Sequence, residues 1–278
     1  MVSIPEMKKS VKASTHGLPP GFSTTTKPTG TLIVQVRGAT GVGKTYTTLK
    51  SIPSPLIYLN GDRDNDLMLG EIRKIRAKFG RGDLITTKRY SLGFKNDVVR
   101  GKGPQLDENA ALARTVRDRF KAEYQAALES DVRYIVIDQS AFVWSLIRIA
   151  RFGKLTEIAQ ILYSQANWEM EQIIHQADDT GKVVVWISPS EVVWEDYIEQ
   201  TPQGPKKSRR ATDRTQSVGY KAFDFAMTVI AEMHYDLAEN KRTMKIVKGV
   251  TGMGDVLEGK QVSIPALLTA ATGVEDWA

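Results

Sequence analysis

Hydrophobic residues gather along the chain in short runs that are separated by longer amphipathic segments. Four of these runs are five to seven residues long and rich in β-branched side chains. Short, nearly continuous apolar runs of this kind are typical of strands that are buried on both faces of a sheet. The four predicted buried strands are residues 31–37, 56–60, 134–138 and 183–188.

The segments between these runs have the spacing of helices. Apolar residues recur every three or four positions from Leu67 to Phe79, and alanines alternate with charges through residues 106–129. Two more helical segments are predicted at residues 142–152 and 156–179. Strands that alternate with helices of this length favour an α/β fold, with a mainly parallel twisted sheet flanked by helices.

The pattern changes in the last third of the chain. Residues 192–201 alternate apolar and charged side chains, as one arm of a hairpin does, and residues 202–216 are predicted to be a basic loop. We expect late antiparallel strands at the sheet edge. The remaining predicted strands are residues 84–92, 223–230 and 243–247.

Composition divides the chain into three parts. Residues 1–30 are rich in Ser, Thr, Pro, Gly and Lys, and they are predicted to be a flexible N-terminal arm. The aromatic residue of this arm, Phe22, is either incidental or an anchor that docks on a neighbour. Residues 31–258 are predicted to form the core, and residues 259–278 a C-terminal tail that covers a sheet edge.

The bulk composition limits the kinds of protein to consider. The 278 residues contain 41% hydrophobic and 25% charged residues, with no apolar run near the roughly 20 residues that cross a bilayer. The absence of cysteine excludes disulfides and thiolate metal sites, so we expect a cytoplasmic location (the host cytoplasm if the protein is viral) and no membrane partner. The net charge of +6 is compatible with a polyanionic partner.

The strongest motif is a glycine-rich loop of the form GxxxxGKT between the first predicted strand and a predicted helix. This strand–loop–helix order is the setting of a P-loop, whose backbone N–H groups surround the phosphates of a nucleotide. The motif predicts ATP and Mg²⁺ as ligands, with Lys44 on the β- and γ-phosphates and the Thr45 hydroxyl on the metal. The predicted nucleotide-binding residues are Gly38, Ala39, Thr40, Gly41, Val42, Gly43, Lys44, Thr45 and Tyr46.

The other half of such a site requires carboxylates. Asp138 ends an apolar strand and is predicted to bind Mg²⁺ with Thr45, although it could be an ordinary strand-end residue. Position 139 holds Gln, where many P-loop ATPases have a catalytic Glu. Asp62, after the second predicted strand, is therefore the candidate catalytic base, unless it only pairs within its own loop. Ser188 and Ser190 are candidate γ-phosphate sensors or turn residues.

Together these pieces resemble the RecA/RadA superfamily of P-loop ATPases, and more closely the short RecA-core nucleotide-binding proteins of phages that are linked to single-strand annealing or recombination. The resemblance covers about residues 31–250. It rests on the P-loop, on Asp62, on Asp138-Gln139-Ser140, on the helix–strand unit of residues 165–188 and on Met244-Lys245-Ile246-Val247-Lys248.

The resemblance implies a RecA-like core in which the strand of residues 183–187 lies between the P-loop strand and the strand that ends in Asp138. It also implies a homo-oligomer, either a ring or a filament, with ATP between protomers. Lys248, or Lys245 as second choice, would then reach the γ-phosphate of the neighbour as a catalytic residue.

DNA-contacting loops would follow the later strands, which the basic segment near residues 206–214 fits. The predicted nucleic-acid residues are Lys206, Lys207, Arg209 and Arg210, unless this run is only a solvated tip. Trp194 and Tyr197 could stack on bases or pack together on one core face.

Three functions fit the sequence to different degrees. The first is a DNA-stimulated ATPase that acts on single-stranded DNA in recombination, annealing or repair. The second is a nucleotide-dependent assembly or switch module with weak hydrolysis, which the missing Glu at position 139 favours. The third, a small-molecule phosphotransferase, is less favoured because the sequence shows no arginine-rich lid.

Overall fold

The strands of the molecule form one sheet whose central part is parallel. The computed structural model describes residues 30–61, 66–93, 98–99, 102–156, 158–201, 204–275 and 277. Asp62 and Phe22, singled out above, lie outside these residues, as does nearly all of the predicted arm. The strands are β1 (Leu32–Gly38), β2 (Leu56–Asn60), β3 (Leu84–Thr86), β4 (Tyr134–Asp138), β5 (Val183–Thr201), β6 (Gly204–Ser217), β7 (Val229–Asp236), β8 (Lys241–Lys248) and β9 (Val256–Glu258).

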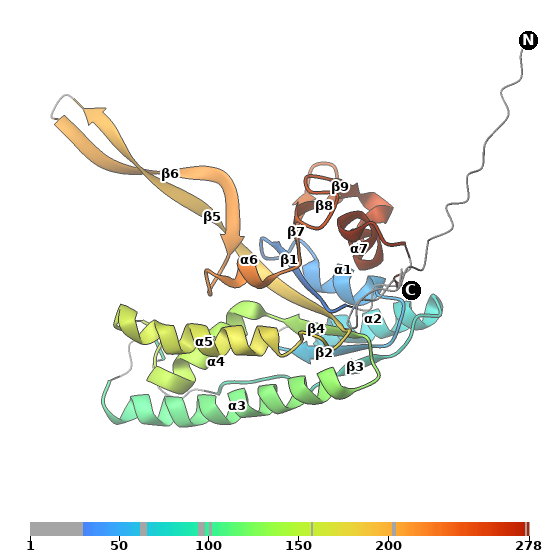
Figure 1. Cartoon of the computed structure of the whole chain (residues 1–278), viewed down its shortest axis with the longest axis horizontal. Helices are drawn as coiled ribbons and strands as arrows, with labels where there is room; N and C mark the ends of the chain where they lie inside the picture. The colour runs from blue at the N-terminus through green and yellow to red at the C-terminus, as the bar shows by residue number, and fades with distance from the viewer. Residues whose placement is uncertain are drawn as a thin grey trace, which may run out of the picture.

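Helices connect most of these strands and cover the sheet (Figure 1). Two 3₁₀ turns, Gln160–Leu162 and Gly259–Gln261, precede α5 and α7. The helices are α1 (Lys44–Ser51), α2 (Asp66–Lys78), α3 (Pro104–Glu129), α4 (Ser140–Phe152), α5 (Tyr163–His175), α6 (Phe223–Ala226) and α7 (Ile264–Thr272).

The strand order is β3-β2-β4-β5-β1-β7-β8-β9, with β6 paired to the outer part of β5. β5 lies between β1 and β4 and is parallel to both, which confirms the order that the resemblance implies. Parallel pairing of six neighbouring strands aligns their carboxyl ends, so the residues that follow β1, β4 and the inner part of β5 meet at one edge. The fold is a RecA-like P-loop core.

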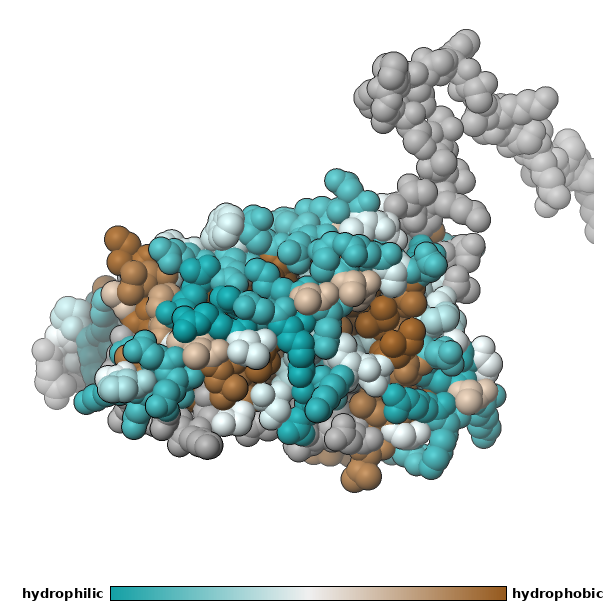
Figure 2. All heavy atoms as spheres, turned by 90° about the horizontal axis from the view of Figure 1, so that it is seen from below, coloured by the Kyte–Doolittle hydropathy of each residue, from teal (hydrophilic) through white to brown (hydrophobic). Residues whose placement is uncertain are grey.

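Alternate residues of the central strands face two separate hydrophobic layers. One layer, which includes α3, α4 and α5, contains Ile33, Ile135 and Trp186. The other layer, which includes α1, α2 and α7, contains Val34 and Val136, the next residues along β1 and β4. This period of two explains the unbroken apolar runs in the sequence, because both faces are covered. On the side seen from below, hydrophilic residues dominate and hydrophobic ones gather in separate patches (Figure 2).

The segment after α7 and the helix itself belong to the core of the molecule. Ile264, Leu267, Leu268 and Trp277 are buried in the layer that also holds α1. Ser263 caps the helix, since its Oγ accepts a hydrogen bond from the N–H of Ala266. The tail predicted at residues 259–278 therefore supplies core side chains. Among the described residues, no helix is long and apolar enough to cross a membrane.

The basic loop predicted at residues 202–216 is wrong, because most of this segment is strand β6. It pairs antiparallel with the outer half of β5, and the two strands project from the body as a long hairpin (Figure 1). Water reaches both faces of this ribbon, so β6 needs no alternation of apolar residues, and its charged sequence gave no strand signal. The hairpin arm predicted at residues 192–201 is confirmed.

The late part of the chain differs from the prediction in two more places. Residues 223–226 form helix α6, and the strand predicted from 223 begins only at Val229. β7 then runs parallel to β1, because the hairpin and α6 carry the chain back to the start of the sheet. Of the strands expected late in the chain, β8 and β9 pair antiparallel at the sheet edge.

Two elements predicted before residue 180 are shorter in the structure than expected. The strand of residues 84–92 stops at Thr86, after which the N–H groups of Thr87 and Tyr90 bond irregularly to β2. The helix of residues 156–179 is confined to Tyr163–His175. Ile161 is 81% exposed and Leu162 is 44% exposed, so these two apolar side chains do not mark a buried helix face.

Candidate functional site

The glycine-rich loop follows β1, and helix α1 begins at Lys44. Gly43 precedes the helix with φ of 91°, a left-handed conformation that favours glycine. A side chain there would also meet Arg242, whose Nε lies 3.0 Å from the position of a Cβ atom. The strand, loop and helix thus have the arrangement that a P-loop requires, with the helix N-terminus directed at the loop.

The Lys44 side chain folds over the loop. Its ammonium donates hydrogen bonds to the carbonyl oxygens of Gly38, at 2.9 Å, and Ala39, at 2.7 Å. These contacts hold a cation at the mouth of the loop, where it would meet the phosphates of a bound nucleotide.

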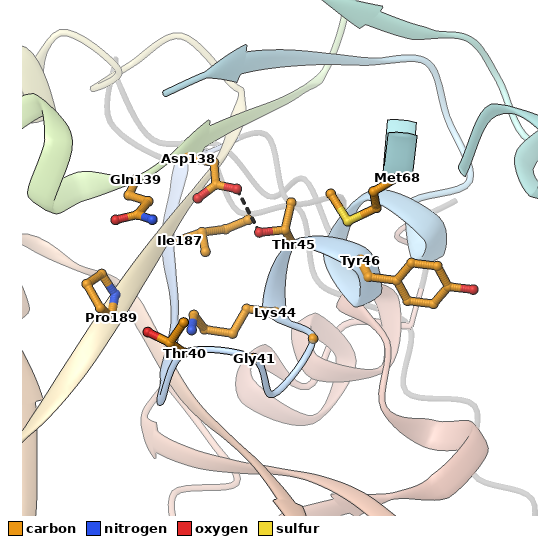
Figure 3. A pocket seen from close by; sticks show the side chains of 11 residues that line it. Thr40, Gly41, Lys44, Thr45, Tyr46, Met68, Asp138, Gln139, Ile187 and Pro189 are labelled. Atoms are coloured by element: carbon orange, nitrogen blue, oxygen red, sulfur yellow. Dashed lines mark hydrogen bonds between the residues drawn. The ribbon is translucent and has the colours of Figure 1, made fainter. Parts of the chain in front are cut away.

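Asp138 is joined to the P-loop by a direct hydrogen bond. The Thr45 hydroxyl donates to Asp138 Oδ2 at 2.7 Å (Figure 3). The Tyr58 hydroxyl donates to the same oxygen at 3.0 Å. The Asp138 side chain is almost fully buried. Two donors on one oxygen stabilise the charged carboxylate and fix its direction. Tyr58 was missed by the sequence reasoning, because a tyrosine in a buried strand gives no sign of which group its hydroxyl meets.

A cavity lies in front of these groups (Figure 3). It contains most of the predicted nucleotide-binding residues, and Lys44, Thr40 and Gln139 surround it in the close view. Four further lining residues, Met68, Gln139, Ile187 and Pro189, were not predicted. The full lining is Thr40, Gly41, Gly43, Lys44, Thr45, Tyr46, Met68, Asp138, Gln139, Ile187 and Pro189.

The oxygen atoms at the cavity fit Mg²⁺. Thr45 supplies a hydroxyl and Asp138 a carboxylate, and Mg²⁺ in phosphate sites uses one or two protein oxygens together with phosphates and water. Within the described ranges, no group of three His, Cys, Asp or Glu side chains could hold a metal by itself. The donor set therefore suits a metal that arrives with a nucleotide.

The candidate base and sensors are placed only in part. Gly61, which precedes Asp62, donates its N–H to the carbonyl of Asp138, so the carboxyl end of β2 adjoins that of β4. Ser188 is fully buried, and its Oγ bonds to the Oγ of Ser140 at 2.7 Å and accepts from Gln35 at 3.1 Å. It therefore lies inside a polar network behind the cavity.

That network continues to the root of the hairpin. Gln35 Nε2 also donates to Ser217 Oγ at 2.6 Å, and Ser217 donates to Asp224 at 2.8 Å. Arg37, the residue before the P-loop, donates to the same carboxylate of Asp224 at 2.6 Å. Buried polar groups thus connect the strand that ends at the P-loop with the last residue of β6 and with α6.

Lys248 lies at the end of β8, away from the P-loop of its own chain. Its ammonium donates to the carbonyl oxygens of Asp224, at 3.2 Å, and Phe225, at 3.0 Å. These carbonyls belong to α6. Lys245, the second choice, is exposed on the same strand.

The basic residues of the hairpin are accompanied by carboxylates. Arg209 pairs with Asp196 at 2.9 Å, and Arg210 lies 3.7 Å from Glu195. Residues 190–217 contain five cations and five carboxylates, so the hairpin has no net charge. Lys206 and Lys207 have no ion pair in the described part of the chain, and they lie near the tip.

The aromatic residues of the hairpin do not pack together on a core face. Trp194 lies opposite Ala211 and is 57% exposed, whereas Tyr197 lies opposite Ser208 with the Arg210 guanidinium 5.8 Å from its ring centre. An odd separation of three residues places them on opposite faces of the ribbon.

No protein-family model matches the chain, and no curated protein sequence matches it. Among solved structures, it is similar to a KaiC-like protein from the archaeon Pyrococcus horikoshii, with 13% sequence identity, a TM-score of 0.37 and 83% of each chain covered. At this TM-score the similarity carries no argument, so the fold assignment rests on the strand order and on the position of the P-loop.

Proposed function

We propose that the protein binds and hydrolyses ATP and acts on single-stranded DNA in recombination, annealing or repair. The observation that supports hydrolysis most directly is the hydrogen bond between Thr45 and Asp138, which lie 93 positions apart in the sequence. It joins the hydroxyl of the P-loop to the carboxylate at the end of a core strand, next to the Lys44 ammonium. These are the groups that phosphoryl transfer requires.

The residues of the cavity have separate tasks in this proposal. The amides of the loop and the helix N-terminus bind the phosphates, and Lys44 stabilises the charge that develops on the γ-phosphoryl group. Thr45 and Asp138 would hold Mg²⁺, which when bound neutralises phosphate charge. Tyr58 keeps the Asp138 carboxylate oriented. Asp62 is proposed to polarise the attacking water.

A second candidate function is an ATP-dependent assembly or switch module that hydrolyses slowly. The observation that favours it is Gln139, which lines the cavity directly after Asp138. An amide can orient water but does not accept its proton at neutral pH. Both candidates use the same binding site and differ in turnover.

The proposal that DNA binds at the hairpin is supported by its projection from the body and by its cations. The carboxylates restrict which cations are free to act. Arg209 and Arg210 would have to leave Asp196 and Glu195, whereas Lys206 and Lys207 can meet phosphates directly. Trp194, exposed on one face, would stack on a base.

We further propose a homo-oligomer in which Lys248 reaches the nucleotide of a neighbour. This role requires the Lys248 ammonium to exchange the carbonyls of α6 for a phosphate oxygen. The exchange would replace two bonds to neutral carbonyls by a bond to phosphate in which both the donor and the acceptor are charged.

Measuring ATP hydrolysis with and without a single-stranded oligonucleotide, together with the mass in solution with ATP, tests the function. We expect turnover that the oligonucleotide stimulates and that falls roughly 100-fold in the Asp138→Asn variant, because the amide binds Mg²⁺ poorly. Slow turnover with nucleotide-dependent assembly would establish the switch module instead. Hydrolysis that DNA leaves unchanged would remove the DNA part of the proposal.

The prediction for the hairpin concerns Lys206 and Lys207, which make no ion pair with any described residue. Replacing Lys206 and Lys207 by Ala should weaken oligonucleotide binding about tenfold and lower the slope of log affinity against log salt by roughly one unit per lysine. Fluorescence anisotropy over a salt series measures both quantities. The matched control is the double variant Lys88→Ala, Lys102→Ala, which removes two exposed charges elsewhere. Equal affinities of the two double variants would place the DNA site off the hairpin.

A further inference from the structure

A second cavity adjoins the nucleotide cavity and is strongly basic. It has a volume of about 480 Å³, and Tyr46 lines both cavities. Its walls come from α1, from the turn between β7 and β8, and from the segment between β9 and α7. The lining residues are Tyr46, Thr47, Lys50, Ser51, Arg81, Glu239, Asn240, Lys241, Arg242, Gly259, Lys260, Val262 and Ser263.

Five cationic side chains line this cavity, against the single carboxylate of Glu239. Lys241 is paired with Glu258 at 2.6 Å. In the part of the chain that the structure describes, the other four cations have no ion pair. Like charges gathered in one hollow repel one another, and their combined field attracts an anion.

The contacts of these cations leave them able to bind an anion. The Lys50 ammonium lies 5.3 Å from the centre of the Tyr46 ring, and Arg81 donates to the carbonyl of Lys50. Neither contact neutralises a charge. Asn240 and Ser263 add polar atoms to the walls, and lysine and arginine together are the side chains that bind phosphate groups most strongly.

Arg242 connects this cavity with the P-loop. Its Nε donates to the carbonyl of Val42 at 3.3 Å, beside Gly43, while its guanidinium lies 5.0 Å from the centre of the Tyr235 ring. A ligand that binds Arg242 therefore contacts a residue that supports the nucleotide loop from behind.

We propose that this basic cavity is a second phosphate-binding site, separate from the nucleotide site whose function is proposed above. Its ligand is an anion with at least two phosphate groups, since four cations without ion pairs face the same space. Two sources supply this chemistry: a small phosphorylated molecule and the backbone of a nucleic acid. The cavity volume of about 480 Å³ lies in the range of small-molecule sites, which favours the small molecule.

Pyrophosphate binding to the full-length Lys44→Ala variant tests this proposal by calorimetry, because that substitution weakens the P-loop site. We expect pyrophosphate to bind, and its dissociation constant to rise at least tenfold when Lys50→Ala and Lys260→Ala are added. The control adds Lys88→Ala and Lys102→Ala and should leave the dissociation constant unchanged. No binding to Lys44→Ala, or equal binding by both sets of variants, would overturn the proposal.

Two further measurements separate this site from its alternatives. The double variant Lys50→Ala, Lys260→Ala, with Lys44 intact, should bind ATP with an affinity within threefold of wild type. If its ATP affinity fell as much as its pyrophosphate affinity, the cavity would be part of the nucleotide site, which would overturn the proposal.

Displacement of pyrophosphate by an oligonucleotide would identify nucleic acid as the source of the phosphate groups. If pyrophosphate stayed bound, the source would be a small molecule. If the Lys44→Ala protein bound no pyrophosphate, and the Lys50→Ala, Lys260→Ala variant had a lower mass in solution than wild type, a second copy of the chain would be the occupant of the cavity and the proposal would be overturned.

Discussion

Replacing Lys44 by Ala should abolish most ATP hydrolysis while leaving the fold intact. The Lys44 ammonium lies over the glycine-rich loop on the carbonyls of Gly38 and Ala39. Among the described residues that line the nucleotide cavity, no other side chain carries a positive charge. Removing one group that stabilises charge in the transition state typically costs roughly 10²–10³-fold in rate. We expect a loss of this size in turnover, and about tenfold weaker ATP binding, in a steady-state phosphate-release assay.

The Lys44→Arg variant tests whether the shape of the Lys44 side chain matters as well as its charge. It keeps the charge, but its planar guanidinium has a different shape and reach from an ammonium. Lys44→Arg should therefore remain strongly impaired. Lys74→Ala, which removes a lysine that is 74% exposed on α2, should retain wild-type turnover. If Lys44→Ala hydrolysed ATP at the wild-type rate, the chemistry would have to occur elsewhere in the molecule.

The sequence predicted the P-loop well because its determinants are contiguous. Strand, glycines, lysine and helix follow one another, and the apolar runs that became β1 and β4 are buried as expected. The contact between Thr45 and Asp138 could be anticipated only through the motif and the resemblance, since strand order decides whether residues 93 positions apart meet.

The hairpin and the basic cavity show what a single sequence leaves undetermined. β6 is held by main-chain pairing with β5 in water, so its side chains carry no period that marks a strand. The cations of the basic cavity come from α1, from Arg81 and from residues 241–260, and only the tertiary fold brings them together. The composition showed that the whole chain is basic, but it did not show where in the fold these cations gather.

The polar network behind the P-loop was also hidden in the sequence. Gln35 and Arg37 interrupt the apolar run of β1, and both side chains are buried. Gln35 meets Ser188 and Ser217, and Arg37 meets Asp224 and Glu232. The network therefore joins the nucleotide strand to the hairpin root by direct hydrogen bonds.

Replacing Arg37 by Met should destabilise the protein by about 3–5 kcal/mol. The Arg37 side chain is 4% exposed and lies between two carboxylates, with its Nη1 2.6 Å from Asp224 and its Nε 3.4 Å from Glu232. Its removal leaves these carboxylates partly buried without their cation. Urea unfolding followed by circular dichroism measures the loss, and Arg73→Ala, on the exposed face of α2, should stay within about 0.5 kcal/mol of wild type.

A double variant separates the ion pair from simple loss of packing. Adding Asp224→Asn to Arg37→Met removes one of the uncompensated charges, so the double variant should be less destabilised than the sum of the two single variants. The amide of Asn can still accept the hydrogen bond from Ser217, which keeps the root of the hairpin in place. Additive losses would instead mean that Arg37 stabilises the fold through its packing, and hydrogen exchange at Ser217 would then be unchanged in Arg37→Met.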